Sequence, residues 1–226
     1  MTEKNIIVAL DDPLDYQGVI EVLDPKKCIL KVGSIIFNYH GRKILDEVAN
    51  HGFEIFFDIK FHDIPNTVSK SIESFKGYPI KLLTIHLSGG FSMIKSAIDS
   101  SKKINAKCIG VSILTSLNEE ESKKVYNQEI SKTVSSMFNL ANETGIDGVV
   151  CSPHELKLAG DLIQNKIKIT PGIRLSDSNS DDQSRVMKPK EAIDLGATYL
   201  VIGRPITSHK DKASAFEKIY QSIYEE

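Results

Sequence analysis

Eight short apolar runs recur along the whole chain, and they constrain the fold more than any other feature of the sequence. Each is rich in residues that favour strands, and none alternates apolar with polar positions as a strand with one wet face would. We therefore expect parallel strands that are buried on both faces. The runs are residues 6–10, 28–33, 54–60, 82–87, 108–114, 148–152, 167–173 and 199–203.

The stretches between these runs are amphipathic and carry the signals of helix ends. Asp12-Pro13 predicts an N-cap followed by proline at the first helical position, and "SPHE" at 152–155 matches a capping box. Glycines stand where helix C-caps are expected, at Gly52, Gly77, Gly145 and Gly196.

The order of these elements predicts the fold class. Eight strands, each followed by a helix, with no linker or shift in composition, indicate one α/β domain over residues 1–226, a single (β/α)8 TIM barrel. A doubly wound sheet is the alternative. It is disfavoured because the first run leads into "ALDDPLD" rather than into the glycine-rich turn G-x-G-x-x-G.

Charge and composition narrow the function classes. The formal net charge of −2 offers no general attraction to nucleic acid or to an anionic membrane, so neither is expected as a partner. No run approaches the roughly 20 apolar residues of a membrane span, and the N-terminus lacks a signal-peptide core. The widely spaced Cys28, Cys108 and Cys151 predict reduced, mostly buried thiols and a cytoplasmic location, with neither a disulfide framework nor a zinc site.

A polar side chain stands at the end of every expected strand. In a barrel the carboxyl ends of the strands meet at one face, where barrel enzymes build their sites. Strands must leave the core there in any case, but a complete ring of polar residues favours a functional origin. The ring consists of Asp11, Lys31, Asp58 with Lys60, His86, Thr115, Ser152, Arg174 and Arg204.

The densest part of this ring lies in "FFDIKFHDIPNTV", which holds Asp58, Lys60 and Asp63. Asp58 and Lys60 are two apart on a strand and so share a face, while Asp11 and Lys31 end the neighbouring strands. A salt-bridge network with Asp63 capping the next helix is the structural alternative. A lysine that forms a Schiff base needs a neutral amine, whereas flanking carboxylates favour the ammonium. Lys60 is therefore predicted to be a proton donor or an electrostatic clamp.

Other polar positions carry weaker signals. His62-Asp63 could suggest a metal site, but no second cluster of ligands has suitable spacing, so no metal is expected. His86 stands alone and is expected to be a hydrogen-bonded structural histidine. Thr115 could bind the polar groups of a ring, although hydroxyl side chains at such positions also cap helices.

The last two strands end in features of a phosphate site. "VIGRPI" places Gly203, where the backbone can approach a ligand, beside Arg204, whose guanidinium can donate two bonds to phosphate. The long polar segment 170–189 is typical of a lid or binding loop and offers Arg174 and Gln183. A tight strand exit with a surface arginine, beside a merely mobile loop, is the alternative.

These motifs together resemble the orotidine 5′-phosphate decarboxylase family, specifically its bacterial form, over nearly the whole chain. The most specific piece is "FDIKFHDIPNTV", supported by "ALD", "KVG", "HLSGG", "LTS", "TPGIR" and "VIGRPI" in the right order. The resemblance implies a (β/α)8 barrel that acts as a homodimer without metal or organic cofactor. It also implies conversion of orotidine monophosphate to uridine monophosphate and carbon dioxide in de novo pyrimidine synthesis.

The resemblance further implies roles for matched residues. Lys60 would protonate C6 of the pyrimidine as carbon dioxide leaves, within a charged network completed by Asp58 and Lys31. Asp11 and Lys31 would also hold the ribose hydroxyls. Thr115 would contact the pyrimidine.

The remaining matched positions concern the partner subunit and the phosphate. Asp63 and Thr67 would reach into the partner's site. The positions around the lid and phosphate are Arg174, Gln183, Gly203 and Arg204. One departure is "DDQ" at 181–183, where a glycine often precedes the Asp-Gln pair, and it bears on the geometry of the lid.

Two alternatives stay open. Metal-dependent sugar-phosphate decarboxylases and synthases share the Asp-x-Lys-x-x-Asp core, but they need a magnesium-binding carboxylate at the second strand, where this chain has Lys31. The continuation "FHDIPNT" also favours the nucleotide enzyme. A catalytically silent nucleotide-binding protein would have lost Lys60 or an aspartate, and all of them are present.

Overall fold

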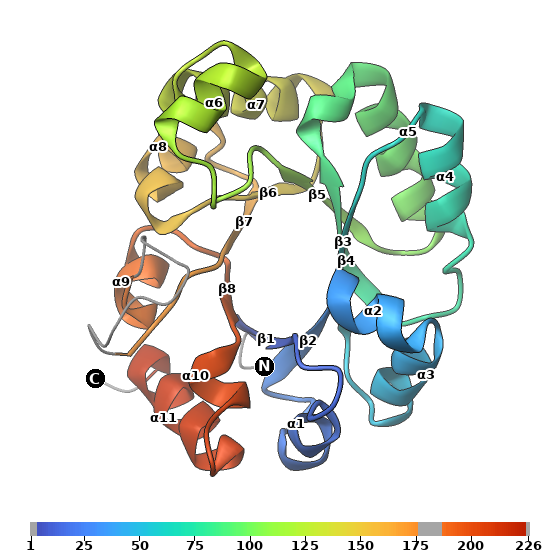
Figure 1. Ribbon diagram of the computed structural model, residues 1–226, viewed down its shortest axis with the longest axis vertical. Coiled ribbons are helices and arrows are strands. Elements are labelled where there is room, and N and C mark those ends of the chain that lie inside the picture. Colours follow the sequence, from blue (N-terminus) through green and yellow to red (C-terminus); the bar gives the residue numbers. More distant parts are fainter. Residues whose placement is uncertain (1–3, 176–186, 225–226) are drawn as a thin grey trace.

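The computed structural model describes residues 4–175 and 187–224, and its eight strands form one closed barrel. Each strand pairs in parallel with the next, and β8 closes the ring on β1. Figure 1 shows the strands as an inner ring with the helices around it. The predicted (β/α)8 barrel is therefore confirmed. The strands are β1 (Ile6–Leu10), β2 (Cys28–Gly33), β3 (Ile55–Phe61), β4 (Ile80–His86), β5 (Lys107–Val111), β6 (Gly148–Val150), β7 (Ile167–Thr170) and β8 (Tyr199–Ile202).

Helices follow every strand, and two of the turns after strands are short 3₁₀ helices. Among residues 4–175 and 187–224, no helix is both long and apolar enough to cross a membrane. The helices are α1 (Gln17–Val22), α2 (Ser34–His40), α3 (Lys43–Asn50), α4 (Pro65–Glu73), η1 (Leu87–Gly89), α5 (Gly90–Lys103), α6 (Glu119–Tyr126), α7 (Ile130–Thr144), η2 (Pro153–Glu155), α8 (Leu156–Leu162), α9 (Pro189–Asp194), α10 (Arg204–Thr207) and α11 (Lys212–Tyr224).

The strands are buried on both faces, as their uniformly apolar sequences predict. In β1, Ile6 and Val8 belong to the large cluster between the strands and the helices, while Ile7 belongs to a smaller cluster inside the barrel. This alternation follows from the two-residue repeat of a strand. The inner cluster consists of Ile7, Ile29, Phe56, Leu82, Ile109 and Ile169.

Several strands end earlier than their sequences predict. β5 ends at Val111, β6 at Val150 and β7 at Thr170, two to three residues before the ends of the corresponding apolar runs. Beyond these ends the regular strand pairing stops, although the Cys151 N–H still donates a 3.0 Å bond to the Ile169 carbonyl of β7. Some of the residues that follow, such as Ile113 and Pro171, surround a central pocket. Apolar character therefore extends beyond the strands because the walls of that pocket are also apolar.

One predicted helix start is wrong. The carboxylate of Asp12 accepts a hydrogen bond of 2.8 Å from the backbone N–H of Leu14, and helix α1 begins only at Gln17. An aspartate can satisfy a turn as well as a helix end, and here the turn prevails. At the other predicted cap, the Glu155 carboxylate accepts a 2.8 Å bond from the Ser152 N–H at the start of η2. The four expected C-cap glycines all have positive φ.

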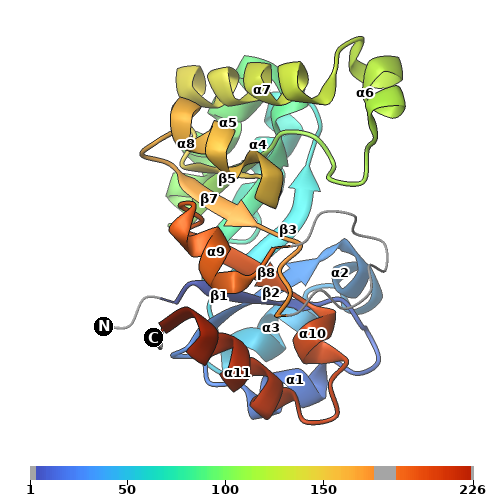
Figure 2. The ribbon, with the colours of Figure 1, turned by 90° about the vertical axis from the view of Figure 1, so that its left-hand side faces the viewer.

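The C-terminal helix α11 contacts residues near the N-terminal strand β1 and helix α1. Helix α11 lies beside α1 (Figure 2), and Lys212 forms an ion pair of 2.9 Å with Asp15. Near the C-terminus, the Tyr224 hydroxyl donates a 2.6 Å bond to the Asn5 side chain, just before β1. These contacts support the closure made by the pairing of β8 with β1.

The three cysteines are free and buried, as predicted. Burial raises the pKa of the Cys28, Cys108 and Cys151 thiols to about 12. At pH 8 only a fraction of about 10⁻⁴ of each would be the reactive thiolate. We expect the native protein to show no rapidly reacting thiol toward Ellman's reagent, and the protein unfolded in guanidinium to show all three. One fast thiol in the native protein would contradict this burial.

Close packing of β6 against β7 leaves no room for a side chain at Gly148. A Cβ there would lie 2.4 Å from the Ile167 carbonyl oxygen, which is rigid backbone. We expect Gly148→Ala to lower the free energy of unfolding by about 1 to 3 kcal/mol, measured by urea denaturation. The control is Gly160→Ala in α8, where a Cβ would meet no atom within 4 Å. That change is expected to raise stability by about 0.5 to 1 kcal/mol, and a loss equal to that of Gly148→Ala would contradict the packing argument.

Candidate active site

A pocket of about 270 Å³ opens at the carboxyl ends of the strands. Its walls include the apolar side chains of Phe56, Val111, Val150, Ile169 and Val201, which come from five different strands. Charged and polar side chains stand among and above them. These are Asp11, Lys31, Asp58, Lys60, Thr115, Arg174 and Arg204.

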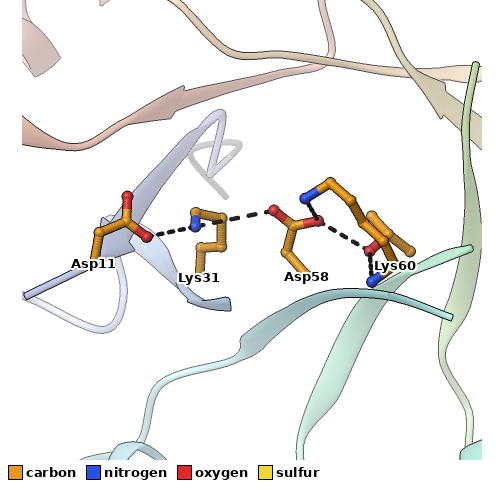
Figure 3. Close-up of polar contacts among 5 residues, drawn as sticks. Asp11, Lys31, Asp58 and Lys60 are labelled. Atoms are coloured by element: carbon orange, nitrogen blue, oxygen red, sulfur yellow. Dashed lines mark hydrogen bonds and ion pairs between the residues drawn. The ribbon is translucent and has the colours of Figure 1, made fainter. Parts of the chain in front are cut away.

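Four of these side chains form a row of alternating charge, Asp11–Lys31–Asp58–Lys60, which we call the charged row (Figure 3). The Lys31 ammonium donates a 2.7 Å bond to the Asp11 carboxylate and lies 3.9 Å from Asp58. The Lys60 ammonium donates a 2.9 Å bond to the other oxygen of Asp58. The prediction that the ends of the first three strands bring these residues together is confirmed.

Strand register brings the charged row together. Lys31 pairs with Ala9 of β1 and with Phe56 of β3, so it lies between the two strands that lead to the aspartates. Gly33 provides the remaining space, because a Cβ at that position would lie 2.9 Å from the Lys31 ammonium nitrogen. A larger residue would push this ammonium away from its partners.

Burial distinguishes the middle of the charged row from its ends. The side chains of Lys31 and Asp58 are only 11% and 13% exposed, whereas that of Lys60 is 33% exposed. Buried charges are stable only when they are paired, and Asp58 has a cation on each side. The result is an ammonium group, that of Lys60, held at the pocket wall by a fixed carboxylate.

Lys60 stands in an irregular part of β3. Phe57 pairs with Leu83 of β4 and Phe61 pairs with Ile85, so residues 58–60 lie opposite the single residue 84. Lys60 has a φ of 53°, a conformation that costs a non-glycine residue about 1 to 3 kcal/mol. Asp58 and Lys60 both line the pocket, as predicted, but they do so through this bulge and not through regular strand alternation.

Thr84 was not identified from the sequence. Its hydroxyl accepts a 3.0 Å bond from the backbone N–H of Lys60 and donates a 2.9 Å bond to the Asp58 carboxylate. A threonine within the apolar run "LLTIHL" gives no signal of such a role, since threonine is common in strands.

Two members of the predicted polar ring, His86 and Ser152, are not among the residues that line the pocket. The His86 ring packs against that of His62, with centroids 5.2 Å apart. Burial, together with the neighbouring His62 and Lys60 side chains, lowers the pKa of His86. Within the described residues no protein group forms a hydrogen bond with the His86 ring, and the expected hydrogen-bonded histidine stays a prediction.

Arg174, Gly203 and Arg204 line the pocket as the sequence predicts. A backbone bridge between Ile173 and Met187 holds the two described flanks of the long polar segment together, and the Arg174 N–H donates a 3.0 Å bond to the Met187 carbonyl. Gln183 lies outside the described residues.

Asp63 and Thr67 do not line the pocket of their own chain, and both are exposed. The Asp63 carboxylate accepts a 2.7 Å bond from the Ile64 N–H, and α4 begins without a side-chain cap. The alternative in which Asp63 caps this helix is therefore wrong. In the described chain, Lys60 pairs with Asp58 and not with Asp63.

No group of three or more His, Cys, Asp or Glu side chains within the described residues is arranged to hold a metal ion. Lys31 lies within β2, two residues before its end at Gly33, and lines the pocket.

Known proteins resemble this chain over nearly its full length. The orotidine 5′-phosphate decarboxylase of Laribacter hongkongensis is 39% identical over 219 residues, which cover 95% of this chain and 90% of the relative. The enzyme of the same name from Coxiella burnetii is 39% identical over 229 residues, covering 98% and 97%. The crystal structure of orotidine 5′-phosphate decarboxylase from Lactobacillus acidophilus superposes with a TM-score of 0.85 at 31% identity, covering 98% of this chain and 99% of that one.

The match to a protein family agrees with these relatives. Residues 4–219 match the family described as "Orotidine 5'-phosphate decarboxylase / HUMPS family", a span that includes every element from β1 to most of α11. The charged row and the pocket lie inside it. This chain belongs to the orotidine 5′-phosphate decarboxylase / HUMPS family.

Proposed function

We propose that this protein is an orotidine 5′-phosphate decarboxylase, which converts orotidine monophosphate to uridine monophosphate and carbon dioxide in de novo pyrimidine synthesis. The observation that carries the proposal is the charged row, with the Lys60 ammonium at the pocket wall 2.9 Å from Asp58. The named relatives at 39% identity support the same reaction.

The chemistry needs a fixed positive charge. When the bond between C6 and the carboxylate breaks, its electron pair stays on C6, and no adjacent carbonyl can accept it. The Lys60 ammonium would stabilise this charge where it develops and donate a proton to C6 as carbon dioxide leaves. A proton from solvent would then restore the ammonium. The apolar walls of the pocket strengthen this interaction because they exclude water.

The other members of the charged row would bind and orient. Asp58 would hold the Lys60 ammonium in place, and Lys31 would keep Asp58 charged and fixed. Asp11, at the outer end of the row, would hold the ribose hydroxyls together with Lys31. Thr115, on the opposite wall after β5, would contact the pyrimidine.

Phosphate binding is assigned to the loops after β7 and β8. Arg174, Gly203 and Arg204 all line the pocket, and an arginine can donate two bonds to a phosphate. We assign Gln183 to the same phosphate site from its sequence match alone. Binding energy from this remote group would help to close the site and so would raise the rate of the chemical step as well as the affinity.

We also propose a homodimer in which Asp63 and Thr67 complete the partner's site. Their exposure, outside the pocket of their own chain, agrees with such a role. Large apolar side chains in the same region also face solvent, with Ile64 67% and Phe91 51% exposed. A second copy that covered them would remove an unfavourable apolar surface from water. Asp63 would then lie beside the substrate carboxylate and repel it.

The alternative is a metal-dependent sugar-phosphate enzyme of the same family. One observation weighs against it. Strand β2 carries Lys31, whose ammonium lies 2.7 Å from Asp11 and 3.9 Å from Asp58, so a positive charge occupies the place where such an enzyme would bind a cation.

The first test is the reaction itself. The purified protein is expected to consume orotidine monophosphate and form uridine monophosphate in excess EDTA, followed by ultraviolet absorbance. Inhibition by EDTA that is reversed by magnesium would favour the metal-dependent alternative. If protein shown to be folded does not convert orotidine monophosphate, the proposed function is wrong.

Lys60→Ala should lower kcat by at least about 10⁴-fold, because both the proton and the stabilising charge are lost. The matched control is Lys81→Ala, which removes another strand lysine, one paired with Glu54 at 3.1 Å and outside the pocket. The control is expected to keep the wild-type rate. A folded Lys60→Ala protein with a near-normal rate would rule out the assigned mechanism.

Sharing of sites across a dimer can be tested by mixing two inactive variants. In an equal mixture of Asp63→Ala and Lys60→Ala, half of the dimers are mixed, and each mixed dimer has one intact site. The activity is therefore expected to recover to about a quarter of the wild-type value once subunits exchange. Absence of recovery, with exchange confirmed by differently tagged subunits, would show that Asp63 acts within its own chain.

A further inference from the structure

The bulge in β3 leaves one backbone group without its usual partner. Between the pairs Phe57–Leu83 and Phe61–Ile85, three residues of β3 stand opposite Thr84 alone, so the regular ladder between the two strands is interrupted. A buried backbone N–H must find another acceptor. For Lys60 that acceptor is the Thr84 side chain, at 3.0 Å.

The directions of the hydrogen bonds around Thr84 are fixed by chemistry. The Asp58 carboxylate can only accept, so the Thr84 hydroxyl uses its single hydrogen for the 2.9 Å bond to Asp58. Its oxygen is then free to accept from the Lys60 N–H. Since the Lys60 ammonium also bonds to Asp58 at 2.9 Å, both ends of Lys60 are tied to the pair formed by Thr84 and Asp58 (Figure 3 shows the ion pair).

Thr84 does not itself reach the pocket. Its side chain is fully buried, and it is not among the pocket-lining residues. Its two contacts are therefore directed at residues that do line the pocket, Asp58 and Lys60, and one of these holds a left-handed backbone conformation with φ of 53°.

We propose that Thr84 is a positioning residue for the decarboxylation, whose hydroxyl holds the Lys60 backbone and the Asp58 carboxylate so that the Lys60 ammonium points at the reacting carbon. The reaction in this statement rests on the proposed function, whereas the positioning rests on the hydrogen bonds alone. Without the hydroxyl, the bulge can relax and the ammonium moves. A displacement of about 1 Å in a reacting group can cost a factor of about 10² in rate.

The kinetic test compares Thr84→Val, which keeps the shape and removes the hydroxyl, with Thr84→Ser, which keeps the hydroxyl. We expect Thr84→Val to lower kcat by about 10²-fold with KM changed less than about threefold, and Thr84→Ser to stay within about threefold of wild type. The control is Thr170→Val, at another fully buried strand threonine that lies outside the pocket lining. It is expected to leave kcat and KM unchanged.

A merely structural role for Thr84 would give different results. Loss of kcat only in proportion to the unfolded fraction, measured by thermal unfolding, would overturn the proposal, and so would equal losses in Thr84→Val and Thr84→Ser. If Thr84→Val does not fold, Thr84→Ala removes the same hydroxyl with less crowding and is judged by the same criteria.

A second readout does not depend on catalysis. Hydrogen exchange of the Lys60 amide, followed by NMR, should be at least about tenfold faster in Thr84→Val than in wild type, Thr84→Ser or Thr170→Val, because the acceptor is lost. Unchanged exchange would overturn the positioning role. If the wild-type protein does not decarboxylate orotidine monophosphate, the proposed function fails, and the exchange data still decide whether Thr84 holds Lys60.

Discussion

The burial of two opposite charges, on Lys31 and Asp58, is the constraint on which the site depends. Each is almost completely removed from water, and a buried ion without a partner would cost several kcal/mol. Their positions follow from parallel register on adjacent strands, and Gly33 leaves the space in which Lys31 meets its carboxylates. Asp58 also pairs with the Lys60 ammonium at 2.9 Å. The Lys60 ammonium, to which the proposed function assigns the proton transfer, is thus held by the same carboxylate that pairs with Lys31.

The barrel provides the rigid frame that holds the charged row in place. Eight paired strands give a rigid frame with no open edge. The inner apolar cluster fills the barrel, and two of its members, Phe56 and Ile169, also form walls of the pocket. At the bulge, Lys60 adopts a left-handed backbone conformation that is unfavourable in itself. The surrounding barrel is stable enough to hold it. The residue with this unfavourable conformation is the one to which we assign the proton transfer, and backbone strain is common at functional sites.

Much of this could be predicted from the sequence, because the relevant signals are local. Uniformly apolar runs identified all eight strands, and the charged residues in or just after the first three runs identified the charged row. The failures have physical causes. Asp12-Pro13 fits a turn as well as a helix start, and a strand bulge depends on pairing with β4, which leaves no trace in the residues around Lys60. Thr84 could not be identified because its role comes from the residue opposite it and not from its neighbours in sequence.

The pairing of β8 with β1 has a consequence for how the chain is made. The side chain of Asn5, just before β1, donates a 2.9 Å bond to the Thr198 carbonyl, a contact that spans 193 residues. One edge of β1 therefore has no partner until Tyr199–Ile202 leave the ribosome, roughly 10 to 40 seconds after β1 at ordinary rates of synthesis. During that interval the nascent chain exposes an apolar strand edge that can pair with other chains. The barrel can therefore close only late in synthesis. Before that point, the native pairing with β8 cannot protect this edge of β1 from aggregation.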